Sequence, residues 1–188
     1  MADPYWFNSK WLALPWFYQQ GYDILLYTLP FHGRRKASTE PFGGYGYFAH
    51  GILHINEAVA QSVYDFRLFM DYLESTGVEK IGVTGISLGG YTSALLAAVE
   101  DRLQFSMPNV PVVSLVDLLY EWFPVAPLVK AGLRIAGINI HEARHTLSVQ
   151  CPLTYAPKLP KERLMIISGA GDRLAPPKHS RLLWEHWD

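Results

Sequence analysis

The segment Gly85-Ile-Ser-Leu-Gly-Gly90 constrains the fold of this 188-residue chain more than any other feature. It follows a short apolar run, Lys80–Thr84, and precedes a stretch rich in helix formers, Tyr91–Glu100. Between a strand and a helix, the pattern G-x-S-x-G places the serine on a sharp, strained turn at the carboxyl end of a sheet. We expect Gly85 and Gly89 to be required there, because a Cβ at either position would collide with the neighbouring chain.

This turn predicts that Ser87 is a nucleophile. The backbone N–H of Leu88 would begin the helix, where unpaired donors and the helix dipole favour negative charge. We therefore expect Leu88 to donate to an oxyanion formed at Ser87. The alternative is a Gly-Ser turn without chemistry, since the bare pattern is common by chance.

The rest of the chain alternates segments of strand and helix character. This alternation predicts an α/β fold, a mostly parallel sheet with helices on both faces, in one domain over residues 1–188. The expected strands are 22–27, 80–84, 110–115 and 163–169, and the expected helices are 8–20, 55–73, 91–100 and 177–187. We expect the first helix to be interrupted at Pro15, and glycines at 21 and 77 to end the first two helices.

The alternation of strand and helix segments stops between residues 117 and 160, where apolar side chains predict one or two helices. Such helices could belong to the core or could form a cap over Ser87 with an apolar wall for a substrate. The position of this segment between two expected strands favours a small helical cap.

Composition excludes several classes of function. Apolar residues make up 49% of the chain and charged residues 18%, as in a folded globular domain. A net charge of −1 gives no reason to expect nucleic acid or an acidic membrane surface as a partner. The single cysteine, Cys151, excludes an internal disulfide and suits a reducing cytoplasm. No apolar run is long enough to span a membrane, so we expect a cytoplasmic protein.

Three segments stand in an order typical of one enzyme family. Gly21–Gly33 combines an apolar strand with the turn Pro-Phe-His-Gly, and Gly85–Gly90 supplies the serine turn. Leu153–Pro177 contains the strand and loop Met-Ile-Ile-Ser-Gly-Ala-Gly-Asp172. Together these segments resemble the α/β-hydrolase family over nearly the whole chain. The serine turn is also similar to that of poorly characterised α/β-hydrolase-domain proteins, in which the sequence reads G-I-S-M-G-G.

The resemblance implies a serine hydrolase that cleaves an ester, thioester or related acyl bond without a cofactor. Its substrate would be a small molecule, with an apolar acyl or aromatic group favoured by the aromatic-rich cap segment. By position, Asp172 is the implied acid that orients a histidine. Asp172 could instead only cap its loop, and Asp117 is a rival acid because some family members place the carboxylate there.

The chain departs from the family pattern at both ends. The family order is serine, acid, histidine, but only 16 residues follow Asp172. We expect His179 and His186 to lie on the surface of the last helix, and the catalytic histidine to lie beyond residue 188. The strand that would supply a second oxyanion donor is also missing before Tyr22. These departures predict a fragment or shortened form of a larger hydrolase, or else a non-catalytic domain that binds a ligand or partner.

One competing motif is a possible zinc site. His141-Glu-Ala-Arg-His145 has the H-E-x-x-H spacing that places two zinc ligands one turn apart on a helix. However, Arg144 puts a cation between the two histidines, and no third ligand follows at a usual spacing. We therefore expect no metal site.

Overall fold

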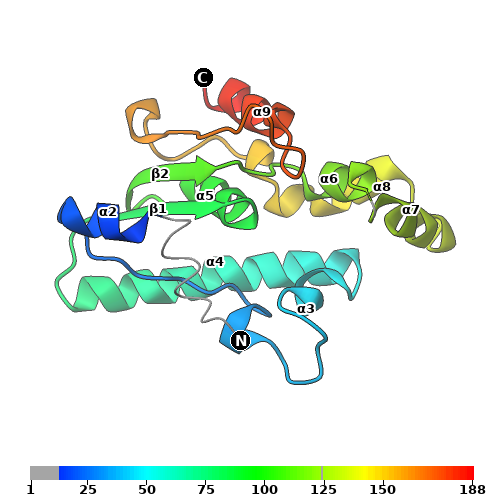
Figure 1. Cartoon of the computed structure of the whole chain (residues 1–188), viewed down its shortest axis with the longest axis horizontal. Helices are drawn as coiled ribbons and strands as arrows, with labels where there is room; N and C mark the ends of the chain where they lie inside the picture. The colour runs from blue at the N-terminus through cyan, green and yellow to red at the C-terminus, as the bar shows by residue number, and fades with distance from the viewer. Residues whose placement is uncertain (1–12, 124) are drawn as a thin grey trace.

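The computed structural model describes residues 13–123 and 125–188, which form an α/β structure (Figure 1). The α-helices are α2 (Leu14–Gln19), α3 (Tyr45–Phe48), α4 (Ile52–Ser75), α5 (Leu88–Val99), α6 (Leu115–Glu121), α7 (Ala126–Ile135), α8 (Ile140–Leu147) and α9 (Pro177–Trp187). The strands are β1 (Ile81–Ile86) and β2 (Leu103–Asn109), and the 3-10 helices are η1 (Gly33–Arg35), η2 (Ser148–Gln150), η3 (Pro152–Thr154) and η4 (Lys161–Arg163).

The sheet is parallel and is flanked by helices. β1 pairs with β2, and in Figure 1 α4 runs below the sheet while α9 lies above it. Helix α5 connects the two strands and packs closely against both. The predicted class, α/β with a parallel sheet between helices, is therefore confirmed, although the described sheet has two strands.

The last expected strand lies beside β2 without forming a continuous ladder. Isolated parallel bridges join Leu164 to Ser106 and Ile167 to Asn109. The N–H of Ile167 donates to the carbonyl of Pro108 at 3.0 Å. This segment consequently adds a third parallel segment beside β2, as the pattern predicted, but with few hydrogen bonds.

The strand expected at residues 110–115 is wrong. The strand is β2, immediately upstream, and residues 110–114 form an irregular connection to α6. Val112 and Val113 are apolar because they are buried in the core, at 1% and 0% exposure. The hydroxyl of Ser114 accepts from the N–H of Asp117 and so starts α6 here.

The strand expected at residues 22–27 is also wrong. The segment has no regular secondary structure and pairs with no described strand. Tyr22 and Leu25 are 48% and 53% exposed. Tyr27 anchors the segment to α4, since its hydroxyl donates to the carbonyl of Ser62 at 2.7 Å. An apolar strand becomes buried only when neighbouring strands and helices cover it, and here α4 covers one side.

The helices follow the sequence pattern more closely. The expected stripe along α4 is buried at Ile55, Val59, Phe66 and Met70, and Gly77 adopts a φ of 91° two residues after the helix ends. Helix α9 has the predicted bounds. Pro15 lies in the first turn of α2, and residues 8–12 of the first expected helix lie outside the described residues.

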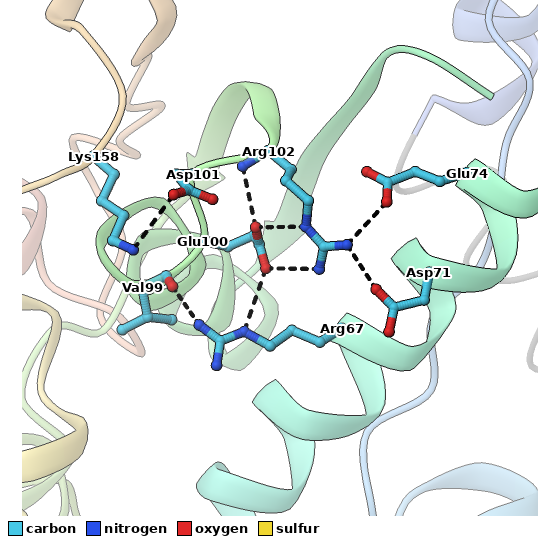
Figure 2. A network of polar contacts seen from close by, with 8 residues as sticks. All are labelled: Arg67, Asp71, Glu74, Val99, Glu100, Asp101, Arg102 and Lys158. Atoms are coloured by element: carbon cyan, nitrogen blue, oxygen red, sulfur yellow. Dashed lines mark hydrogen bonds and ion pairs between the residues drawn. The ribbon is translucent and has the colours of Figure 1, made fainter.

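An ion-pair network holds the carboxyl half of α4 against the start of β2 (Figure 2). Its centre is Glu100, whose side chain is 3% exposed and accepts from both Arg102 and Arg67. Arg102 also donates to Asp71 and Glu74 on α4, at 2.7 and 3.0 Å. The hydrogen bonds from Arg102 outweigh burial and lower the pKa of Glu100 to about 2. The buried carboxylate is therefore charged at neutral pH and compensated by two guanidinium groups.

Candidate active site

Ser87 lies on a strained turn between β1 and α5. Its φ is 56° and its ψ is −107°, a conformation that residues other than glycine rarely adopt. Its side chain is exposed at the carboxyl end of β1. The strand–turn–helix geometry expected from the sequence is therefore present, and the serine is accessible to a substrate.

The structure confirms the requirement for one of the two expected glycines and adds a third position. A Cβ at Gly85 would lie 2.5 Å from the carbonyl carbon of Gly89, so Gly85 is required as predicted. A Cβ at Gly89 itself would meet nothing within 4 Å, so that part of the expectation is wrong. The second crowded position is Gly90, where a Cβ would lie 2.5 Å from the Asn109 carbonyl oxygen. In the sequence, only the position of Gly90 next to Gly89 could have indicated that glycine is required there.

Backbone hydrogen bonds fix the turn, and the first N–H groups of α5 are left without partners within the helix. The N–H of Ser87 donates to the Asn109 carbonyl at 3.0 Å, and the N–H of Tyr91 donates to the Ser87 carbonyl at 2.8 Å. Leu88 is the first residue of α5, so its N–H has no partner within the helix. It is also at the positive end of the helix dipole. This arrangement suits Leu88 N–H as a donor to an anion next to Ser87.

Asp172 caps its own loop and lies at the same edge of the sheet as Ser87. Its Oδ1 accepts from the N–H groups of Leu174 and Ala175 at 2.8 and 2.9 Å. This is the loop-capping role considered from the sequence. Its Oδ2 accepts no hydrogen bond from the described parts of the chain. A carboxylate that caps with one oxygen can still accept from an imidazole with the other.

Contacts across β2 connect the two ends of the site. Ser87 bonds to Asn109, as above, and the N–H of the next residue, Val110, donates to the Ile167 carbonyl at 2.7 Å. Val110 has a φ of 41°, so the chain turns sharply at the end of β2 as well as at Ser87. Asp172 follows five residues after Ile167. Ser87 and Asp172 thus flank β2 at the carboxyl ends of neighbouring parallel segments.

The rival acid, Asp117, is occupied by other partners. Arg144 donates to its Oδ1 through two nitrogens, and the Ser114 hydroxyl donates to its Oδ2 at 2.6 Å. Burial raises the pKa of Asp117, but the hydrogen bonds from Arg144 and Ser114 outweigh it, so that pKa lies below its usual value. An ion-paired carboxylate that joins α6 to α8 is less suited to orient a catalytic histidine.

The two histidines of α9 are not surface groups, contrary to the expectation. His179 is 1% exposed, and its Nδ1 has no hydrogen-bond partner among the described residues. Burial and the charge of Lys178 lower its pKa. His186 is half-buried, with Nε2 2.8 Å from the Tyr155 carbonyl oxygen. Within the described residues, no histidine hydrogen-bonds to Ser87 or Asp172.

The H-E-x-x-H motif has a structural role in the described chain. His141 and His145 are exposed on α8. Glu142 closes a capping box, accepting from the N–H of Asn139 at 2.8 Å while the Asn139 side chain accepts from the Glu142 N–H at 3.0 Å. No group of three potential metal ligands occurs among the described residues.

Two open cavities lie along α4, away from the serine turn. One, of about 360 Å³, lies between Phe31 and the amino half of α4, and the other, of about 460 Å³, lies between Leu26 and its carboxyl half. Arg35 lines both, and its guanidinium pairs with Asp65. Neither cavity includes Ser87 or Asp172. None of the described helices combines the length and apolar character needed to cross a bilayer.

Comparison with known proteins places the chain beside larger relatives. No family model matches it. It is 31% identical over 176 residues to uncharacterized protein MT2702 of Mycobacterium tuberculosis strain CDC 1551 / Oshkosh. It is equally similar to uncharacterized protein Rv2627c of strain ATCC 25618 / H37Rv. The match covers 89% of this chain but only 39% of each relative, so the chain spans less than half the length of these proteins.

Proposed function

We propose that this chain carries the nucleophile and the acid of a serine hydrolase with an α/β-hydrolase type of fold. The observation that carries the proposal is the backbone of Ser87, strained at a φ of 56° between a parallel strand and a helix and exposed at the sheet edge. Strain of this kind persists where the surrounding structure requires it, and it is concentrated at functional sites.

In the proposed reaction, Ser87 Oγ attacks the carbonyl carbon of an ester, thioester or related acyl bond. A general base takes the hydroxyl proton, and the Leu88 N–H stabilises the tetrahedral oxyanion. Collapse expels the alcohol or thiol, which takes the proton from the base. Water then hydrolyses the acyl-enzyme by the same steps. Asp172 Oδ2 would orient the base, which we place outside the described residues because no described histidine hydrogen-bonds to Ser87 or Asp172.

A second candidate function is a domain that binds an acyl ligand or a partner without catalysis. The same absence of a base beside Ser87 in the described residues favours it. The two proposals differ in whether Ser87 can be activated once a base is supplied.

Fluorophosphonate labelling with free imidazole separates these proposals. If the turn and the oxyanion donor are competent, imidazole in place of the base should accelerate adduct formation at Ser87 by at least about ten-fold. Intact-mass analysis should show one adduct, absent in Ser87→Ala and retained in Ser75→Ala, which removes an exposed hydroxyl on α4. A chain shown to be folded by circular dichroism that forms no adduct with imidazole would support the binding domain.

A further inference from the structure

The seven histidines of this chain include two pairs that are four residues apart, and one pair lies on a single helix. His141 and His145 both belong to α8. Residues at positions i and i+4 of a helix lie one above the other on the same face. Imidazole nitrogens are good ligands of Zn²⁺, Ni²⁺ and Cu²⁺. The fold of α8 therefore places two such ligands one helical turn apart.

The rings of this pair are accessible and are not bound to other parts of the described chain. Both residues are exposed. The His141 N–H donates to Asn139 Oδ1 at 2.9 Å, and the His145 carbonyl accepts from the Ser148 hydroxyl at 2.7 Å. These hydrogen bonds use backbone atoms of the two histidines, so the ring nitrogens are available to an ion.

The helix that carries the pair is held in place by the protein before any ion binds. Ala143 and Leu147, on the opposite side of α8, are 2% and 6% exposed and belong to the core. The capping box formed by Asn139 and Glu142 fixes the first turn. Because the backbone is already ordered, binding of an ion costs little backbone entropy.

The cation that argues against a metal ion in the sequence is compensated in the structure. Arg144 donates through Nε and Nη2 to Oδ1 of Asp117 on α6, so its guanidinium belongs to an ion pair. The Glu142 carboxylate accepts from the Asn139 N–H and is committed to the start of the helix. It is therefore not placed as the general base of a zinc protease. This arrangement favours binding of an ion without hydrolysis.

The second pair, His50 and His54, has the same spacing but a different geometry. His50 precedes the start of α4, whereas His54 lies in its first turn. The two rings meet edge to face, with centroids 5.1 Å apart and an interplanar angle of 89°. His54 Nδ1 lies 3.4 Å from Glu57 Oε2, and its Nε2 is buried. Because the lone pair of a ring nitrogen lies in the plane of the ring, this arrangement does not direct two nitrogens to one ion.

We propose that His141 and His145 form a two-ligand surface site for a divalent transition-metal ion, with water in the remaining coordination positions. Cu²⁺ should bind most tightly, because affinity for such sites rises from Mn²⁺ to Cu²⁺ and falls again at Zn²⁺. The bound ion joins the first and second turns of α8. The site is independent of Ser87, and the proposed hydrolase assigns no role to either histidine.

Calorimetric titration of the untagged chain with Cu²⁺ tests this site. The parent should bind one ion at this site, and Zn²⁺ should bind more weakly. His141→Ala and His145→Ala should each weaken Cu²⁺ binding at least about ten-fold, because a second ligand on the same helix acts at a high effective concentration. The electron paramagnetic resonance spectrum at one equivalent of Cu²⁺ should show coupling to two imidazole nitrogens in the parent and to one in each variant.

The matched control is His50→Ala, which removes an exposed histidine from the pair with the same spacing. It should bind Cu²⁺ as the parent does. Because the substituted side chains are exposed, circular dichroism should show all variants folded. Loss of affinity in the control equal to that in the α8 variants would overturn the proposal. So would coupling to a single nitrogen in the parent, or binding that survives both α8 substitutions, which would show an adventitious ion only.

Discussion

Gly90 lies so close to Asn109 that a Cβ at position 90 would stand 2.5 Å from the Asn109 carbonyl oxygen. That same oxygen accepts the N–H of Ser87 at 3.0 Å. The close packing of α5 on the end of β2 and the position of the serine turn are therefore one structural feature. Alanine substitutions at Gly90, which is crowded, and at Gly89, which is not, should therefore differ in their effect on stability.

Gly90→Ala should destabilise the protein and disturb Ser87, whereas Gly89→Ala should not. The added methyl at 90 meets backbone that cannot move without shifting β2, which costs about 1–3 kcal/mol. At 89 the methyl meets open space, and alanine favours the helix by roughly 0.5–1 kcal/mol. Urea unfolding would measure both, and imidazole-assisted labelling of Ser87 should fall only in Gly90→Ala. Equal stability of the two variants would contradict the crowding at Gly90.

Asp172→Asn and Asp172→Ala should separate the two roles of this residue. Asparagine keeps an oxygen that can accept from Leu174 and Ala175, so the loop should remain capped and the stability nearly unchanged. Alanine removes the cap and should cost about 1 kcal/mol. If Asp172 orients the base of a hydrolase, Asp172→Asn should reduce ester hydrolysis at least about a hundred-fold at normal stability. Full activity of the asparagine variant would leave Asp172 as a loop cap alone.

Glu100 should make folding sensitive to acid. Its pKa is about 2 in the folded chain, below the ordinary 4.5, so its contribution to stability is complete above pH 4.5 and is lost as the pH falls from there toward 2. Because its arginine partners are partly exposed, we expect a contribution of about 2 kcal/mol. Glu100→Gln should remove this contribution at pH 7 and flatten the acid dependence of urea unfolding.

The control for this network is Asp101→Asn. Asp101 is 74% exposed on its side chain and pairs with Lys158 at 3.9 Å (Figure 2). An exposed pair contributes little, so its loss should change stability by no more than about 0.5 kcal/mol. A loss of stability as large as that in Glu100→Gln would mean that burial does not account for the contribution of Glu100.

His179 should add a second acid-sensitive contribution at a higher pH. Burial lowers its pKa in the folded chain, so the unfolded chain binds the proton more readily. Stability should therefore fall as the pH drops below about 6.5, the ordinary value for histidine. His179→Gln should remove this dependence between pH 7 and 5 while leaving that of Glu100 intact. A parent whose stability is constant over that interval would contradict the lowered pKa.

The sequence by itself determined the elements whose signals are local. The pattern Gly85-Ile-Ser-Leu-Gly sets a strand, a turn and a helix over consecutive residues, and the stripe from Ile55 to Met70 repeats at helical spacing. The bounds of α9 likewise follow from Pro177 and its neighbours. Such features depend on contacts within a few residues, so they can be read without knowing what packs beside them.

Only the tertiary structure decided which segments pair and what is buried. Val112 and Val113 have the composition of a strand but lie in an irregular core segment, while β2 contains Gln104 and Pro108. Gly90 is required because of Asn109, nineteen residues away. His179 is buried, and this result does not follow from helical spacing. These properties depend on partners distant in sequence, because packing is a relation between elements and a local pattern specifies only one of them.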